Sequence, residues 1–174
     1  MKKIIALVLV VLMALSAVSA LAEGMPGPSK TAPFINRGEA EELELVKVDP
    51  DEKLSAIIEA VKAAGADGAV AALPTDASSL IPEGFVTINE MDCYQLVGDV
   101  ENAKDQELIF KFATPYPEGE EVILLIGISP ADADVEWLAL DGKANADGAV
   151  VVKVTKEQLT KIANNPFVVI PVSK

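Results

Sequence analysis

Beyond residue 83 the chain consists of short apolar-rich segments, and in 106–113 and 148–155 apolar and polar residues alternate, which is the pattern of β-strands with one buried face. Leu108 and Phe110 fall on one face of such a segment, whereas Lys111 points the opposite way. Polar turn residues separate the segments of this kind, which span about 85–89, 93–99, 106–113, 121–128, 134–141, 148–155 and 167–172. Short strands at this spacing predict an antiparallel sandwich of two sheets, of the immunoglobulin-like kind.

The segment 121–128 departs from this pattern, because apolar residues occupy both of its faces. One face carries Val122, Leu124, Ile126 and Ile128, and the other carries Ile123 and Leu125. Such a strand is either central and covered on both sides, for instance by a helix, or part of an interface with a partner. In the second case Ile123 and Leu125 belong to a contact surface.

A helix is predicted over residues 50–64. Asp49 is expected as its N-cap, with Pro50 at the first helical position and Glu52 completing a capping box. Apolar residues then recur at helical spacing, at Leu54, Ile57, Ile58 and Val61. Gly65 is expected to end the helix. The single apolar stripe requires another element to pack against.

Thr155, followed three residues later by Gln158, forms a second capping box and predicts a short helix before the last strand. Its Leu159 and Ile162 are placed to cover one end of the sandwich, an insertion relative to a standard immunoglobulin domain. The expected fold is therefore mainly β, an antiparallel immunoglobulin-like sandwich of about seven strands with an N-terminal helix and this short helix. The expected divisions are a signal peptide at 1–22, a flexible acidic leader at 23–45, a helical segment at 46–82 and the sandwich at 83–174.

The N-terminal residues have the organisation of an export signal. Lys2 and Lys3 precede an apolar run from Ile4 to Leu15, which small residues follow. This pattern predicts cleavage after Ala22 and an extracellular, secreted protein with no stable membrane anchor. The alternative is an uncleaved anchor, although the apolar run is short for a bilayer span.

The charge of the chain disfavours partners that carry phosphate. The formal net charge is −13, and removal of residues 1–22 with their two lysines makes it about −15. Nucleic acid and anionic lipid both require basic patches that neutralise phosphate, so neither is an expected partner.

The chain contains no histidine, which removes Ser-His-Asp and Cys-His catalysis and the histidine-based zinc sites. Glycine-rich nucleotide-binding loops are also missing from the sequence. The expectation is that the protein is not an enzyme, with a glycosidase that uses only carboxylates left open. Cys93, the only cysteine, is interpreted as a core residue, with an intermolecular disulfide or a reactive thiol as the alternatives.

Two candidate sites remain. Asp132, Asp134 and Glu136 alternate along the chain and offer the hard oxygen ligands that Ca²⁺ prefers, although no cofactor is expected overall. Trp137 and Tyr116 are candidates for contact with a sugar or a protein if they are exposed, although a core position is the commoner fate of a tryptophan in a sandwich. The segment 143–148 resembles a calcium loop less than it resembles a hairpin turn through Asp147 and Gly148.

The export signal, the acidic leader and the segments TPYPEGEEVILLIGI, VEW, GKANADGAVVV and FVVIPVS together resemble small exported proteins of anaerobic Gram-positive bacteria with immunoglobulin-like domains of uncharacterised function. The resemblance covers about residues 83–174 and transfers no site residue. We therefore expect an exported, non-enzymatic binding or structural module that contacts another protein or a cell-surface polymer through a surface or an edge strand. The alternative is a small carbohydrate-binding or carbohydrate-active protein that uses Trp137, Tyr116 and nearby carboxylates.

Overall fold

The computed structural model describes residues 34–36, 43–98, 100, 104–163 and 165–174. The predicted signal peptide at 1–22 and most of the predicted leader lie outside these ranges. Within them, no helix has the length and apolar character that crossing a bilayer requires.

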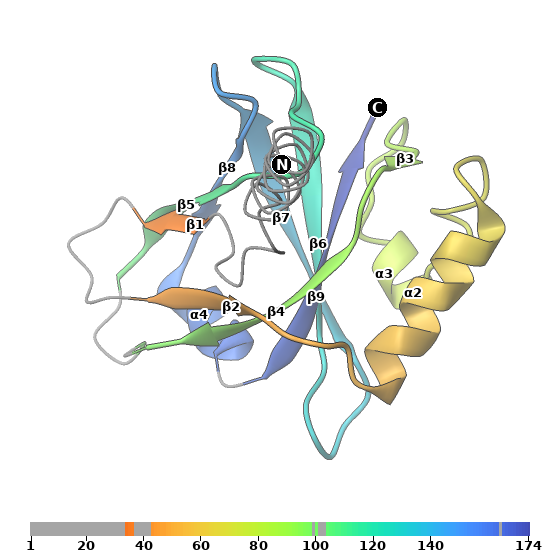
Figure 1. Ribbon diagram of the computed structural model, residues 1–174, viewed down its shortest axis with the longest axis horizontal. Coiled ribbons are helices and arrows are strands. Elements are labelled where there is room, and N and C mark those ends of the chain that lie inside the picture. Colours follow the sequence, from red (N-terminus) through yellow and green to blue (C-terminus); the bar gives the residue numbers. More distant parts are fainter. Residues whose placement is uncertain (1–33, 37–42, 99, 101–103, 164) are drawn as a thin grey trace, which may run out of the picture. The chain divides into compact units, whose positions relative to one another are not determined.

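All of the described strands belong to one antiparallel sheet that curls into a half-barrel (Figure 1). The strands are β1 (Phe34–Asn36), β2 (Glu44–Lys47), β3 (Thr87–Ile88), β4 (Asp92–Val97), β5 (Gln106–Phe110), β6 (Glu121–Ile128), β7 (Glu136–Ala144), β8 (Val150–Val154) and β9 (Pro166–Ser173). Their order is β1-β5-β8-β7-β6-β9-β4-β2, and β3 also pairs with β9.

Each of the seven predicted strands is present, but their expected division between two sheets is not confirmed. β9 explains the difference, because it pairs with β6 along one edge and with β4 along the other. This strand therefore joins segments that a sandwich would place in separate layers. The single sheet then buries its inner face because it curls and its own strands face each other across the core, so no second sheet is needed.

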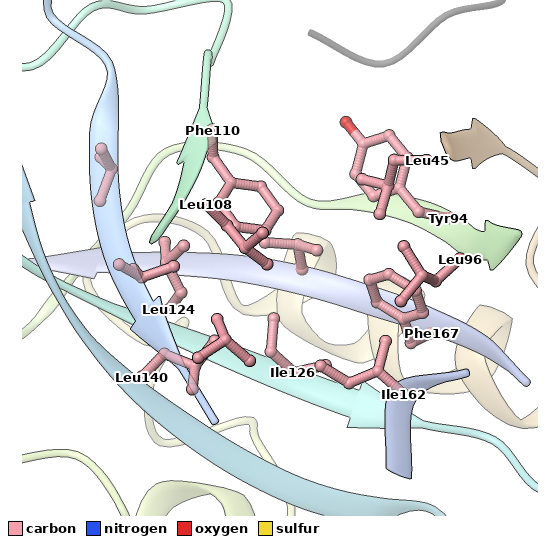
Figure 2. Close-up of a cluster of buried hydrophobic side chains, with 14 of the residues drawn as sticks. Leu45, Tyr94, Leu96, Leu108, Phe110, Leu124, Ile126, Leu140, Ile162 and Phe167 are labelled. Carbon is pink, nitrogen blue, oxygen red and sulfur yellow. The ribbon is translucent and has the colours of Figure 1, made fainter. Parts of the chain in front are cut away.

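The inner face of the half-barrel forms one hydrophobic core, part of which Figure 2 shows. Side chains from opposite walls of the sheet meet there, including Leu108, Leu124 and Phe167. Helix α4 (Lys156–Ile162) contributes Leu159 and Ile162 to the same core. Its predicted capping box is confirmed, since the Thr155 hydroxyl accepts from Gln158 N–H and the Gln158 side chain accepts from Thr155 N–H.

Helices α2 (Glu52–Ala64) and α3 (Thr75–Ser78) cover the outer face of the sheet and form a second core. The predicted stripe on α2 supplies buried Leu54, Ile58 and Val61. These residues pack in the same cluster as Leu125 of β6 and other outward residues of the sheet. The sheet is therefore apolar on both faces where the helices lie.

Strand β6 settles the question raised by its two apolar faces. It lies between β7 and β9. Its even-numbered residues from Val122 to Ile128 join the inner core, while Ile123 and Leu125 join the outer one. The covered, central alternative is correct, so burial of Ile123 and Leu125 needs no partner protein.

The start of α2 differs from the prediction by two residues. Asp51, rather than Asp49, is the N-cap, and its carboxylate accepts a hydrogen bond from Leu54 N–H at 2.9 Å. Glu52 is consequently the first helical residue and completes no capping box. Asp51 has an additional partner, the Ser129 hydroxyl, which the sequence spacing could not reveal. Gly65 ends the helix with a φ of 67°, as predicted.

The expected leader was wrong at its C-terminal end. Residues 44–47 form β2, whose Leu45 is buried in the inner core together with the preceding Leu43. β2 adds to β4 in antiparallel register, with Leu45 opposite Leu96. The glutamates of this segment suggested a solvated leader, but Glu44 lies exposed between the two buried leucines. Alternation over so few residues is a weak signal beside the acidic composition.

Candidate functional site: the free edge of strand β7

β7 is much longer than the strand with which it forms a hairpin. It pairs with β6 from Glu136 to Lys143, but it pairs with β8 only from Gly142 to Ala144. The two strands lie together near their turn and separate toward α4 (Figure 1). Over residues 136–141, β7 therefore has no second neighbouring strand within the described part of the chain.

The hydrogen bonds at the end of β7 show which residues direct their backbone toward the gap. Ala144 N–H donates to Glu120 O on the β6 side at 2.8 Å, whereas Asn145 N–H donates to Ala149 O on the β8 side at 2.8 Å. Successive residues of a strand direct their N–H and C=O groups to opposite edges. Trp137 and Ala139 consequently present their backbone groups to the gap, where β8 no longer pairs with β7 within the described part of the chain.

A groove of about 830 Å³ opens where the two strands part. It is lined by β7 from Ala139 to Lys143, by Val151 and Lys153 of β8, and by Thr155 and Gln158 at the start of α4. Glu121 and Ile123 of β6, together with Pro82 and Phe85 before β3, complete the lining on the outer face of the sheet. The groove reaches Ala139, and the free edge of β7 continues from there toward Trp137.

The side chains along the free edge are apolar and incompletely covered. Trp137, Leu138 and Ala139 are each half-buried. The Trp137 ring lies against Gly127 of β6, so closely that a Cβ at that glycine would be 2.8 Å from it. Trp137 is therefore neither a fully buried core residue nor a fully exposed one. It packs at the border of the outer core and keeps part of its surface accessible.

Carboxylates lie at both ends of the free edge. Glu136 begins β7, Asp132 and Asp134 precede it in the loop, and Asp141 follows, all with exposed side chains. The groove also contains Glu121, whose carboxylate binds Lys174 Nζ at 2.6 Å. This ion pair lowers the pKa of Glu121.

The loop between β6 and β7 binds the ammonium group of a lysine from helix α2. Lys53 Nζ donates to Pro130 O at 2.7 Å and to Ala133 O at 2.6 Å. Among the described residues, no group of three or more acidic or cysteine side chains is arranged to hold a metal ion. Calcium binding by Asp132, Asp134 and Glu136 thus remains a prediction without a preformed ligand cage.

The structure separates the other candidate contact residues from this edge. Tyr116 is buried in the inner core, where its ring makes an edge contact with Phe112 at 5.9 Å between centroids. Burial raises the pKa of Tyr116 to about 12. Leu125 is fully buried in the outer core, and Ile123 lines the groove with 5% of its surface exposed. Of the four predicted contact residues, which also include Trp137, only Trp137 lies on the free edge.

Cys93 occupies a core position beneath the helices, with 4% of its surface exposed. Burial, reinforced by the Asp92 carboxylate, raises the pKa of the thiol to about 11. The interpretation of Cys93 as a core residue is confirmed.

Sequence reasoning missed the free edge because it gave the two strands of the hairpin equal lengths. In the structure β7 continues to Ala144, and the turn through Asp147 and Gly148 follows, with Gly148 at a φ of 73°. β8 ends at Val154 because the Thr155 capping box starts α4. The capping box was the signal in the sequence that could have shown this. It ends β8 after five residues, so that part of the longer strand β7 has no neighbour on that side.

No family model, curated protein or solved structure matches this chain. The functional argument therefore rests on the geometry of β7 and its groove.

Proposed function

We propose that the protein is an exported, non-enzymatic binding module that takes up an extended segment of another protein as an added strand on β7. The observation that carries this proposal is the unpaired edge of β7 over residues 136–141. The apolar segment between Lys3 and Ala22, which is typical of a signal peptide, supports export.

The backbone of the edge supplies the affinity in this proposal. The N–H groups of Trp137 and Ala139 can donate hydrogen bonds to a guest strand, and their C=O groups can accept hydrogen bonds from it, at the spacing of an antiparallel pair. Each hydrogen bond formed contributes on the order of 1 kcal/mol net. A guest strand also covers the half-buried side chains of Trp137, Leu138 and Ala139, which adds apolar burial at about 25 cal/mol per Å².

Between Glu136 and Asp141 at its two ends, the free edge lacks the devices that usually protect a strand from added partners. Natural edge strands are shortened, or carry lysine, proline or a bulge. The terminal strands β1 and β2 follow this rule by being three and four residues long. In contrast, β7 presents the sequence Trp137-Leu138-Ala139-Leu140, which contains neither a charge nor a proline. This exception favours an edge that serves for contact.

A carbohydrate-binding role receives less support from the geometry. That alternative depends on Trp137 and Tyr116 acting together, but the two rings belong to different cores on opposite faces of the sheet. A protein partner requires only Trp137 and the backbone beside it. We therefore place the protein ligand first among the two kinds of partner.

A matched pair of variants tests the proposal. Ala139→Pro removes an N–H that faces the gap and leaves the β6 hydrogen bonds in place, whereas Ala139→Val keeps the N–H with a side chain of similar size. A random library of displayed peptides is selected on the full chain, and the enriched peptides are measured against both variants. The expected result is binding that Ala139→Pro abolishes and Ala139→Val retains. Peptides that bind both variants equally well would refute an added strand.

A further inference from the structure

We infer that the guest of the β7 edge is a cationic segment, with an apolar alternating centre and lysine or arginine at the end that lies beside Glu136. This inference rests on the proposed function, because it specifies the chemistry of the same edge. Charge complementarity carries it, together with the placement of the few nearby lysines.

The start of the free edge is strongly acidic. Asp132, Asp134 and Glu136 are all exposed there. The lysine closest to them in the described contacts, Lys53, directs its ammonium group to the backbone oxygens of Pro130 and Ala133. No described salt bridge involves any of the three carboxylates. They are consequently available to a cation from outside the chain.

At the other end of the free edge, positive and negative side chains lie together. Lys143 and Lys153 line the groove there with Asp141 and Glu107, next to the residues at which β7 and β8 pair. Lysines thus offset carboxylates at the paired end of the hairpin, while the free end has no such offset among its described residues. A guest with one basic end is therefore matched best when that end lies next to Glu136.

A second copy of this chain fits the edge poorly. Antiparallel pairing of two β7 strands would bring the Glu136 end of each strand against the Asp141 end of the other. The formal net charge of −13 on each copy adds a long-range repulsion. The same net charge attracts a cationic partner and accelerates its approach at low salt.

Defined peptides test the inference on the full chain. The first has a threonine-valine alternating core with two lysines at each end, the second replaces these lysines with glutamates, and the third has the lysine ends with a proline within the core. Binding is measured by fluorescence anisotropy at low and high salt. We expect the lysine-ended peptide to bind about tenfold more tightly than the glutamate-ended one at low salt, as two exposed ion pairs would give. The proline peptide is expected not to bind.

Two double variants locate the preference. Asp134→Asn with Glu136→Gln is expected to remove most of the tenfold difference. Glu118→Gln with Asp147→Asn removes the same charge from exposed residues in the loops at the other end of the sheet, and is expected to preserve the difference.

The outcomes separate the two proposals. Equal binding of lysine-ended and glutamate-ended peptides that Ala139→Pro abolishes would overturn the charge preference and leave the added strand in place. A preference for lysine that neither Ala139→Pro nor the peptide proline affects would show general attraction and overturn both. Absence of binding by every peptide would also overturn both.

Discussion

The Ser129 hydroxyl donates a hydrogen bond of 2.5 Å to the carboxylate of Asp51, which at the same time caps helix α2 through Leu54 N–H. Ser129 directly follows β6, and its loop leads into β7. Lys53 binds the same loop through two backbone oxygens, of Pro130 and Ala133. The first turn of α2 thus fixes the loop from which the free edge of β7 begins.

Replacement of Asp51 by alanine is expected to lower the free energy of unfolding by about 1–2 kcal/mol, because the helix loses its cap and Ser129 loses its acceptor. Ser129→Ala removes only the second interaction and is expected to cost less. Denaturant unfolding of both variants and of their combination gives the coupling energy between the two residues. Strictly additive costs would contradict the shared carboxylate.

The same carboxylate predicts a contribution to stability that depends on pH. Burial opposes ionisation of Asp51, but hydrogen bonds from Leu54 N–H and Ser129, with nearby Lys53, outweigh it and lower the pKa below its ordinary 3.8. Because the folded pKa is the lower one, this stabilisation is complete above the ordinary pKa and is lost as the pH falls through the folded pKa. Asp51→Asn keeps a capping side chain without the charge. Its unfolding free energy should decline less steeply in acid than that of the unmodified chain, and an equal decline would exclude Asp51 as a source.

Because β6 contributes side chains to both cores, truncation of a leucine on either of its faces is expected to lower the stability by a similar amount. Leu124 faces the inner core and Leu125 the outer core, and both have 0% of their surface exposed. Leucine to alanine at either position is expected to cost about 2–5 kcal/mol in unfolding free energy. Leu80→Ala serves as the control, since 39% of Leu80 is exposed. A small loss at Leu125 would show that α2 and α3 do not cover that face as described.

Gly127 and Trp137 lie opposite each other on β6 and β7, and they predict a steric effect that fluorescence detects. A methyl group at Gly127 would lie 2.8 Å from the Trp137 ring and 3.0 Å from Val168. Gly127→Ala is therefore expected to displace the ring, to increase quenching of tryptophan fluorescence by acrylamide, and to cost about 1–3 kcal/mol. The chain has a single tryptophan, so the signal is unambiguous. Unchanged quenching would place the ring elsewhere.

The buried thiol of Cys93 is expected to resist chemical labelling. Only the thiolate reacts, and burial together with Asp92 raises the pKa to about 11. A disulfide reagent at mildly alkaline pH should label the folded protein only as fast as it unfolds, and should label it at once in guanidinium. Rapid labelling of the folded protein would revive the reactive-thiol alternative.

Local signals predicted most of the elements, whereas long-range pairing decided how they assemble. Apolar segments between polar turns, some of them alternating, located each of the seven strands, and the Thr155 capping box located α4. Periodicity does not determine which strand lies beside which, so the pairing of β9 with both β6 and β4 was not predicted and one sheet was divided into two. Strand β2 was missed because its few residues carry a leader-like composition.

The candidate site was predictable only in part, for a related physical reason. Aromatic character singled out Trp137, which lies on the free edge, but it also selected Tyr116, which the inner core buries. Ile123 and Leu125 were selected for their apolar character, which a central strand needs on both faces. The feature that unites the site is an unsatisfied backbone edge, and residue type alone does not reveal where a neighbouring strand ends.

Amide hydrogen exchange along β7, measured residue by residue by NMR, tests the central claim most directly. The amides of Leu138 and Leu140 bond to β6 and should exchange slowly, whereas those of Trp137 and Ala139 face the gap and should exchange far faster. Addition of the lysine-ended peptide is expected to slow Trp137 and Ala139 and to leave Leu138 and Leu140 unchanged. Slow exchange of all four amides in the free protein, or no added protection by a bound peptide, would contradict a free edge that serves for binding.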